Sequence, residues 1–205
     1  MVFEDGTMQV LSVPTLIAST SQPPSVLSHD QLLLLRKNLP PRFGLCDWAL
    51  LYSTEQHGCS LRTCYSRLDG SCGTLLVCLD GEGHIFGSFV TEEWADVHRD
   101  GKRYFGNGET FLFKMHPTFR RYNWTRRNDH FVLAAPDCLA FGGGGHFGLY
   151  FDGSFEYGSS QESATFENDC LASTPQFKVI KVEVWGFVHE GRDFSGATRT
   201  RTRDS

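Results

Sequence analysis

The sequence lacks the features by which several classes of protein are recognised. No uninterrupted apolar run in its 205 residues reaches the length of about 18 residues that a membrane-spanning helix needs. The formal net charge of -5 has the wrong sign for a general nucleic-acid binder, whose surface is usually basic. The first residues, MVFEDGTMQV, lack both the basic start of a secretion signal and the glycine that myristoylation requires. We therefore expect no membrane insertion, no nucleic-acid partner and a cytoplasmic location.

The patterns that bind metals or build a disulfide framework are missing as well. The seven cysteines contain no CxxC spacing and the eight histidines no HxxxH spacing, so a structural zinc site has no support. An odd cysteine count at irregular spacing indicates a reducing compartment. Asp80, Glu82 and His84 alternate with glycine as in a calcium loop, but the closing glutamate of an EF-hand is absent, and a hairpin turn is the better interpretation. We expect neither a metal nor a cofactor.

Signatures of nucleophilic catalysis are also absent. There is no GxSxG elbow, and His57 and Cys59 lie only two residues apart, a spacing that seldom allows a hydrogen bond between them. The glycine run that contains Gly143 and Gly144 leads into a predicted strand instead of a helix. It therefore indicates close passage of the backbone past another element, not a phosphate-binding loop. The sequence predicts a protein that is not an enzyme.

Phenylalanine and glycine, by contrast, are abundant. The chain has 17 Phe and 21 Gly; aromatic residues favour half-buried strands, and glycines favour turns. Helical spacing predicts helices over 28–39, with Ser28 and Gln31 as a capping box, and over 60–68. The predicted strands cover 48–53, 74–80, 84–91, 110–116, 119–124, 130–134, 147–152 and 177–188. Many short strands with a few helices predict a mostly β, α+β domain with a sandwich-like arrangement.

The composition changes at both ends of this predicted domain. Residues 1–26 are rich in Ser, Thr and Pro without a sustained period, and residues 189–205 are polar. We expect both segments to be flexible and the folded domain to cover residues 27–188. At this length one substantial core is expected, not two.

The segment YFGNGETFLF contains the most specific local pattern. Gly106 and Gly108 flank an asparagine and predict a tight turn, and Glu109 follows directly before an aromatic strand. In that strand Phe111, Phe113 and Met115 are expected on one face and Leu112, Lys114 and His116 on the other. Glu109 is either a general acid or base, or an anchor that accepts turn N–H groups or pairs with an arginine. Because no second acid stands at a telling spacing, we favour the anchor.

Arginines cluster around two aromatic residues after the next turn. Tyr122 and Trp124 lie among Arg120, Arg121, Arg126 and Arg127. Arginine beside exposed aromatics is typical of protein interfaces, and a solvated rim is an equally good interpretation. Single-stranded nucleic acid ranks last because the chain is acidic.

Taken together, six motifs in this order resemble the TLDc domain family over about residues 27–188. The motifs are WALLYST with His57-Gly58 and Ser60-Leu61, YFGNGETFLF, Tyr122-Asn-Trp124, FGGGG with Phe147-Gly148-Leu149, Thr165-Phe166 with Asn168, and EVWGF from Glu183.

The resemblance implies two antiparallel sheets packed as a β-sandwich and flanked by a few short helices. It implies that Gly106, Gly108, Glu109, Gly143, Gly144, Trp185 and Gly186 are hallmark positions. It also implies protection from oxidative stress and, as for several TLDc proteins, binding and regulation of the vacuolar-type proton-pumping ATPase (V-ATPase) through its V1 sector. No established catalytic mechanism comes with the family. For this chain, Arg120, Arg121, Trp124, Arg126 and Arg127 are the candidate partner-binding residues.

Two alternatives stay open at this stage. One is a structural accessory protein of a ciliary, axonemal or other cytoskeletal assembly, with microtubule or axonemal proteins as partners. The other is a redox-active antioxidant protein that uses Cys59, Cys64 or Glu109, since an exposed thiol with a depressed pKa is reactive.

Overall fold

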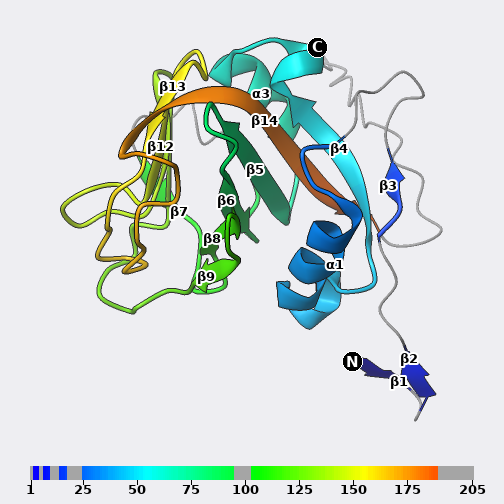
Figure 1. Ribbon diagram of the computed structural model, residues 1–205. Coiled ribbons are helices and arrows are strands. Elements are labelled where there is room, and N and C mark those ends of the chain that lie inside the picture. Colours follow the sequence, from blue (N-terminus) through cyan, green and yellow to red (C-terminus); the bar gives the residue numbers. More distant parts are fainter. Residues whose placement is uncertain (1, 5–6, 10–13, 18–24, 95–102, 189–205) are drawn as a thin grey trace, which may run out of the picture.

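The computed structural model describes residues 2–4, 7–9, 14–17, 25–94 and 103–188 (Figure 1). The predicted tail over 189–205 and much of the predicted leader over 1–26 therefore lie outside the described residues. Within the leader, residues 14–17 and 25–26 contact the folded domain.

Helices are few and short among the described residues. They are α1 (His29–Asn38), the 3-10 helix η1 (Pro41–Phe43), α2 (Thr54–His57) and α3 (Leu61–Leu68). The strands are β1 (Val2–Glu4), β2 (Thr7–Gln9), β3 (Leu16–Ile17), β4 (Asp47–Ser53), β5 (Thr74–Asp80), β6 (Ile85–Val90), β7 (Arg103–Phe105), β8 (Phe111–His116), β9 (Arg120–Tyr122), β10 (Val132–Ala135), β11 (Cys138–Phe141), β12 (Leu149–Asp152), β13 (Tyr157–Ser159) and β14 (Gln176–Val188). None of the described helices is long and apolar enough to cross a membrane.

One long strand, β14, joins two antiparallel sheets. The first sheet has the order β7-β10-β11-β12-β13-β14, and the second continues from β14 through β5, β6 and β8 to β9. The start of β14 pairs with β13, whereas its later part lies between β5 and β4. Figure 1 shows β14 curving from the side of β12 and β13 across to β4. The predicted two-sheet, mostly β fold is confirmed, with β14 common to both sheets.

The main core lies between the two sheets. Buried side chains from the second sheet, such as Leu76 and Leu112, form one cluster with Leu139 and Phe151 of the first sheet. Helix α3 adds its apolar face to this cluster, and the Tyr65 hydroxyl donates to the Cys138 carbonyl at 2.8 Å. Because β5 is buried on both faces, its sequence is a continuous apolar run without alternation.

A second apolar cluster lies under α1, on the opposite face of the sheet. It includes the predicted row of Phe111, Phe113 and Met115 from β8, while Leu112 belongs to the other cluster. The predicted division of this strand into two faces is therefore confirmed. Helix α1 begins with the predicted capping box, in which the side chains of Ser28 and Gln31 each accept from the other residue's backbone N–H.

Several short elements were not predicted from the sequence. They are β1, β2, β3, β7, β11, β13, α2 and the 3-10 helix η1. β11 is four residues long and buried throughout, so it has no polar–apolar alternation to read. β13 contains Gly158, a residue that normally argues against a strand; a Cβ there would lie 2.4 Å from the Phe177 ring, so glycine is required for this close approach.

Candidate functional site

The glycine turn before β8 is closed by an asparagine side chain. The Asn107 Oδ1 accepts from the Glu109 N–H at 2.9 Å, and the Asn107 carbonyl accepts from the Thr110 N–H at 2.9 Å. Gly106 has φ 109°, which favours glycine, and a Cβ on Gly108 would lie 2.6 Å from the Trp124 ring. Both glycines are thus needed for the path of the backbone.

The Glu109 carboxylate pairs with an arginine across the surface. Its Oε1 accepts from Arg42 Nη1 at 2.6 Å and its Oε2 accepts from Arg42 Nη2, which makes a bidentate pair. This hydrogen bonding to Arg42 holds the pKa of Glu109 below its usual value. Of the two anchoring roles considered for Glu109, the arginine pair is the one present, and Asn107 accepts the turn N–H groups. The side chain is 44% exposed, so the pair ties η1 to the turn in contact with solvent.

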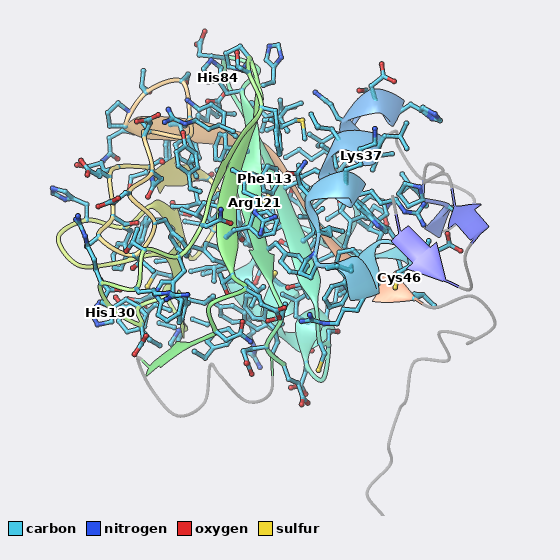
Figure 2. All side chains as sticks on the ribbon, turned by 90° about the horizontal axis from the view of Figure 1, so that it is seen from below. Lys37, Cys46, His84, Phe113, Arg121 and His130 are labelled. Carbon is cyan, nitrogen blue, oxygen red and sulfur yellow. The ribbon has the colours of Figure 1, made fainter. Side chains whose placement is uncertain are left out.

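Two of the candidate partner-binding residues hold elements together. The Arg121 guanidinium donates to the Asn38 carbonyl at the end of α1 and lies 4.0 Å from the centroid of the Phe111 ring. Figure 2 labels Arg121 beside Phe113, its cross-strand partner. The Trp124 indole donates to the Asn128 carbonyl at 2.8 Å. Arg121 and Trp124 are therefore partly committed to packing within the domain.

The other three arginines are exposed on the rim. Arg120 pairs with Asp169, Arg127 pairs with Glu167, and Arg126 takes a left-handed conformation with φ 67°. The rim is therefore a mixed-charge surface, because two of its three arginines are already balanced by acidic neighbours.

The glycine run after β11 lies against neighbouring side chains. A Cβ on Gly143 would lie 2.9 Å from the His130 Cβ, and Gly144 has φ 86°. The Gly143 N–H donates to the Thr165 hydroxyl at 2.9 Å. Gly142, Gly143 and Gly144 thus occupy space where no side chain fits, as expected for backbone crowding.

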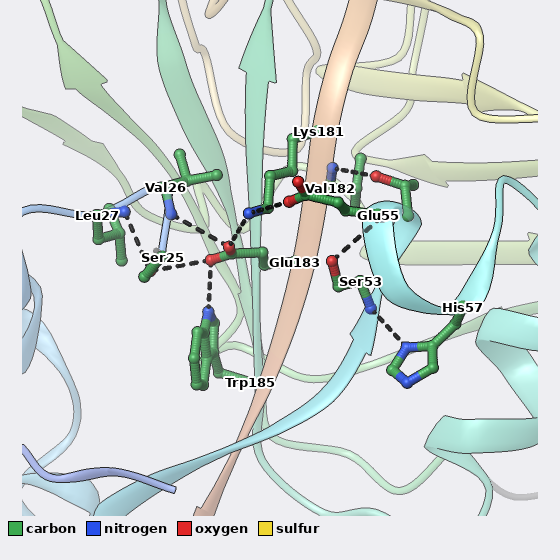
Figure 3. A network of polar contacts seen from close by, with 11 residues as sticks. Ser25, Val26, Leu27, Ser53, Glu55, His57, Lys181, Val182, Glu183 and Trp185 are labelled. Carbon is green, nitrogen blue, oxygen red and sulfur yellow. Dashed lines mark hydrogen bonds and ion pairs between the residues drawn. The ribbon is translucent and has the colours of Figure 1, made fainter. Parts of the chain in front are cut away.

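The sequence reasoning missed a buried polar network centred on Glu183 (Figure 3). The Glu183 carboxylate is almost fully buried and accepts from the Ser25 hydroxyl at 3.0 Å, the Val26 N–H at 3.1 Å and the Trp185 indole at 3.1 Å. Lys181 adds an ion pair at 3.2 Å. Each carboxylate oxygen therefore has hydrogen-bond partners, as a buried carboxylate requires.

Lys181 extends this network to α2. Its ammonium group lies 2.6 Å from the Glu55 carboxylate as well as near Glu183. Burial alone would lower the pKa of Lys181, but the two carboxylates outweigh it and raise the pKa above its ordinary value. The network therefore joins the segment before α1, the middle of β14 and α2.

The end of this network at α2 is fixed by neutral contacts. The Thr54 hydroxyl accepts from the Val182 N–H at 3.1 Å, and His57 Nδ1 accepts from the Ser53 N–H at 3.0 Å. Burial, followed by the charge of Arg67, lowers the pKa of His57, which favours the neutral ring that this acceptor role needs. A lone glutamate and lysine in the otherwise apolar run VIKVEVWGFV were the signal for this network in the sequence.

Trp185 and Gly186 complete the β14 motif. The Trp185 indole belongs to the cluster under α1, and a Cβ on Gly186 would lie 3.0 Å from the Leu51 side chain. Like Glu109, these hallmark positions act through packing and hydrogen bonds in this fold.

No disulfide joins the seven cysteines, all of which lie within the described residues. Cys59 and Cys72 are exposed, whereas Cys64 and Cys78 are buried, and burial raises the pKa of both buried thiols. Cys72 is also kept in the thiol form, because partial burial and then the charges of Glu93 and Glu92 raise its pKa. Among the described residues, no group of His, Cys, Asp and Glu is arranged to hold a metal ion.

Comparison with known proteins identifies relatives over most of the chain. The TLDc domain profile matches residues 20–188. The chain is 38% identical to oxidation resistance protein 1 of Bos taurus over 169 residues, which cover 82% of this chain and 19% of that protein. It is 38% identical to nuclear receptor coactivator 7 of Gallus gallus over 173 residues, which cover 79% of this chain and 18% of that protein. It is 36% identical to oxidation resistance protein 1 of Cryptococcus neoformans over 199 residues, which cover 88% of this chain and 42% of that protein. The chain thus spans about a fifth of the length of the two vertebrate relatives.

Proposed function

Because this chain belongs to the TLDc domain family, we propose that it is a non-enzymatic interaction module that binds the V1 sector of the vacuolar-type proton pump and supports resistance to oxidative stress. The observation that carries the proposal is the match to a protein named for oxidation resistance, which is 38% identical and covers 82% of this chain. The proton pump is proposed as the partner because of the family resemblance, since several TLDc proteins bind it.

The site geometry supports binding over catalysis. Glu109, the most obvious candidate for acid–base chemistry, is engaged by Arg42 on both oxygens and has a lowered pKa, so it is a weak base for abstracting a proton. Glu183 is enclosed by its four donors. The carboxylates of Glu109 and Glu183 are both used to fix the domain, which leaves the surface for partners.

Capture from a cell lysate tests the binding partner. The immobilised full chain is expected to retain V1 subunits, identified by mass spectrometry. Recovery of microtubule or axonemal proteins in their place would support the cytoskeletal alternative, and a folded chain that captures neither would contradict both proposals.

Survival under peroxide tests the oxidative-stress role. A fungal strain that lacks its own oxidation resistance protein is expected to regain survival when it expresses this chain. Cys59→Ser should restore survival equally well if the chain acts by binding. Loss of rescue in that variant, together with peroxide consumption by the pure protein, would favour the redox alternative.

A further inference from the structure

The outer face of the first sheet is formed by side chains that point away from the core. Val132, Leu139 and Phe151 belong to the core between the sheets. Their strand neighbours therefore point to the opposite face, because side chains alternate along a strand. Figure 1 shows this sheet, with β7, β12 and β13, on the opposite side of the molecule from α1.

Strand register places two tyrosines in one row across this face. Tyr104 pairs with Leu133, Leu133 with Ala140, Ala140 with Tyr150, and Tyr150 with Ser159. Leu133 and Ala140, which lie between the two rings, are buried, so this part of the row meets solvent mainly through the two partly exposed tyrosines.

Stacked neighbours hold both rings of the row. The Tyr104 ring stacks on His130 at 4.4 Å between centroids, and the Tyr150 ring stacks on Phe147 at 5.8 Å. Such prepared rings bind with little further loss of side-chain entropy.

The same face continues onto two strongly exposed apolar side chains. Tyr157 of β13, which pairs with Lys178, is 58% exposed, and Ile180 of β14 is 56% exposed. Over residues 14–16, 25–94 and 104–188, only one other large apolar side chain, Leu45, is similarly exposed to solvent. We call the surface formed by Tyr104, Tyr150, Tyr157 and Ile180 the tyrosine face.

Acidic side chains border the tyrosine face. Asp137 and Glu156 are exposed in the turns beside it, and no ion pair between described residues uses either carboxylate. Burial, and then the charges of Cys138, Asp137 and Asp152, raise the pKa of Tyr150, which is consistent with Asp137 lying near the ring. Lys178 is the basic residue on this side. The arginine rim differs, because its charges are largely paired already.

We propose that the tyrosine face binds an extended, arginine-bearing segment of a partner protein. Arginine side chains would stack on the tyrosine rings and pair with Asp137 and Glu156, and an apolar side chain of the same segment would contact Ile180. Tyrosine-rich surfaces with a few unpaired charges are typical of interface hot spots. The proposal rests on the role of this chain as an interaction module and names the surface that performs it.

Peptide titration tests the chemistry of the face directly. The probe is a synthetic peptide in which arginine alternates with serine, and its control carries glutamate in place of arginine. The full chain should bind the arginine peptide more tightly, and Tyr157→Ser should raise its Kd by about tenfold, as expected for loss of one stacked cation. Asp137→Asn should weaken binding and make it less sensitive to salt. Because Tyr157 and Asp137 are exposed, both variants should keep the wild-type melting temperature. An equal Kd for wild type and both variants would overturn the proposal.

Variants on the rim supply the matched control. Arg120→Ala combined with Arg127→Ala should leave the peptide Kd unchanged; a larger effect there than at Tyr157 would contradict the tyrosine face. Replacing Arg199, Arg201 and Arg203 by Ala should likewise leave the Kd unchanged. Tighter binding by that variant would mean that the chain's own arginines occupy the face, and would overturn a partner segment as its occupant.

Lysate capture with the same variants separates this proposal from the proposed function. V1 subunits lost with Tyr157→Ser but retained with Arg120→Ala would support both. Subunits retained with Tyr157→Ser and lost with Arg120→Ala would overturn the tyrosine face and leave pump binding standing. If wild type and every variant capture no pump subunits, pump binding is contradicted but the tyrosine face is not. The peptide titration then decides whether the tyrosine face binds an arginine-bearing segment.

Discussion

Glu183 and Glu109 each balance a basic side chain, but solvent reaches only one of them. The Glu183 side chain is 3% exposed and holds Lys181, whereas Glu109 is 44% exposed and holds Arg42. Removing one partner of a buried ion pair costs several kcal/mol because the other charge is left without a partner away from water. In an exposed pair, water solvates whichever charge is left, so the cost is small. The two residues should therefore differ strongly in their effect on stability.

Glu183→Ala is expected to lower the free energy of unfolding by about 3–5 kcal/mol, because it leaves a buried ion pair broken and the Trp185 indole without its acceptor. Glu183→Gln keeps an acceptor oxygen and should cost less. Urea unfolding followed by tryptophan fluorescence measures both, and a loss below about 1 kcal/mol for Glu183→Ala would show that the network is not stabilising.

Glu109→Ala is expected to cost less than about 1 kcal/mol, because its pair with Arg42 is solvated and screened by salt. The cost should shrink further in high salt. Thermal melts at low and high ionic strength test this, with Arg42→Ala as the matched variant from the other side of the pair. A salt-independent loss of several kcal/mol would contradict a surface pair.

Asp80 should give the domain part of its acid sensitivity. Burial alone would raise the pKa of Asp80, but the N–H groups of Ser173, His84 and Glu82 donate to its carboxylate and hold the pKa below the usual value. Its contribution is therefore complete above the unfolded pKa of about 3.9 and is lost as the pH falls through the folded pKa. Asp80→Asn should be less stable than wild type at neutral pH, and the difference in unfolding free energy should narrow below about pH 4. A difference that stays constant with pH would exclude this role.

The roles of some of these residues could be predicted from the sequence, and the roles of others could not. The glycine turn and the arginine alternative for Glu109 could be inferred because turn chemistry is local. The pairing of Glu109 with Arg42 could not, because the two residues are 67 positions apart. The role of Glu183 depends on which side chains surround β14, and no spacing along the chain encodes those neighbours.

At the scale of elements, the helices and longer strands were predictable, since α1 has its capping box and β8 its alternation. The short strands β7, β11 and β13 were not, because β7 pairs only with the distant β10, β11 is buried without alternation, and β13 contains Gly158.

Strand β6 illustrates a tertiary requirement on one residue. A Cβ on Gly87 would lie 1.8 Å from the Leu76 carbonyl oxygen of β5, a backbone atom that cannot move without breaking the ladder. Gly87→Ala is therefore expected to destabilise the domain by at least about 3 kcal/mol. The control is Gly81→Ala in the adjoining turn, where the nearest atoms lie 3.9 Å away, and its unfolding free energy should stay close to wild type. Equal stability of the two variants would show that β5 and β6 can separate at this point.

For the whole molecule, cysteine labelling reports which parts are closed to solvent. Cys59 and Cys72 are exposed, whereas Cys46, Cys64, Cys78 and Cys138 are buried. A thiol reagent should therefore modify the two exposed cysteines in the native protein and the four buried ones only after unfolding, with mass spectrometry identifying each site. Fast native labelling of Cys64 or Cys78 would mean that the core between the sheets opens readily.

The shared strand β14 also sets the order in which the domain can be completed during synthesis. It is the last described strand, yet it pairs with β13, β5 and β4, which come from widely separated parts of the chain. Until residues 176–188 leave the ribosome, β4, β5 and β13 each present an unpaired edge, and such edges readily associate with other chains. The domain therefore stays incomplete until β14 has been synthesised, and the interval before that is when it most needs chaperone protection.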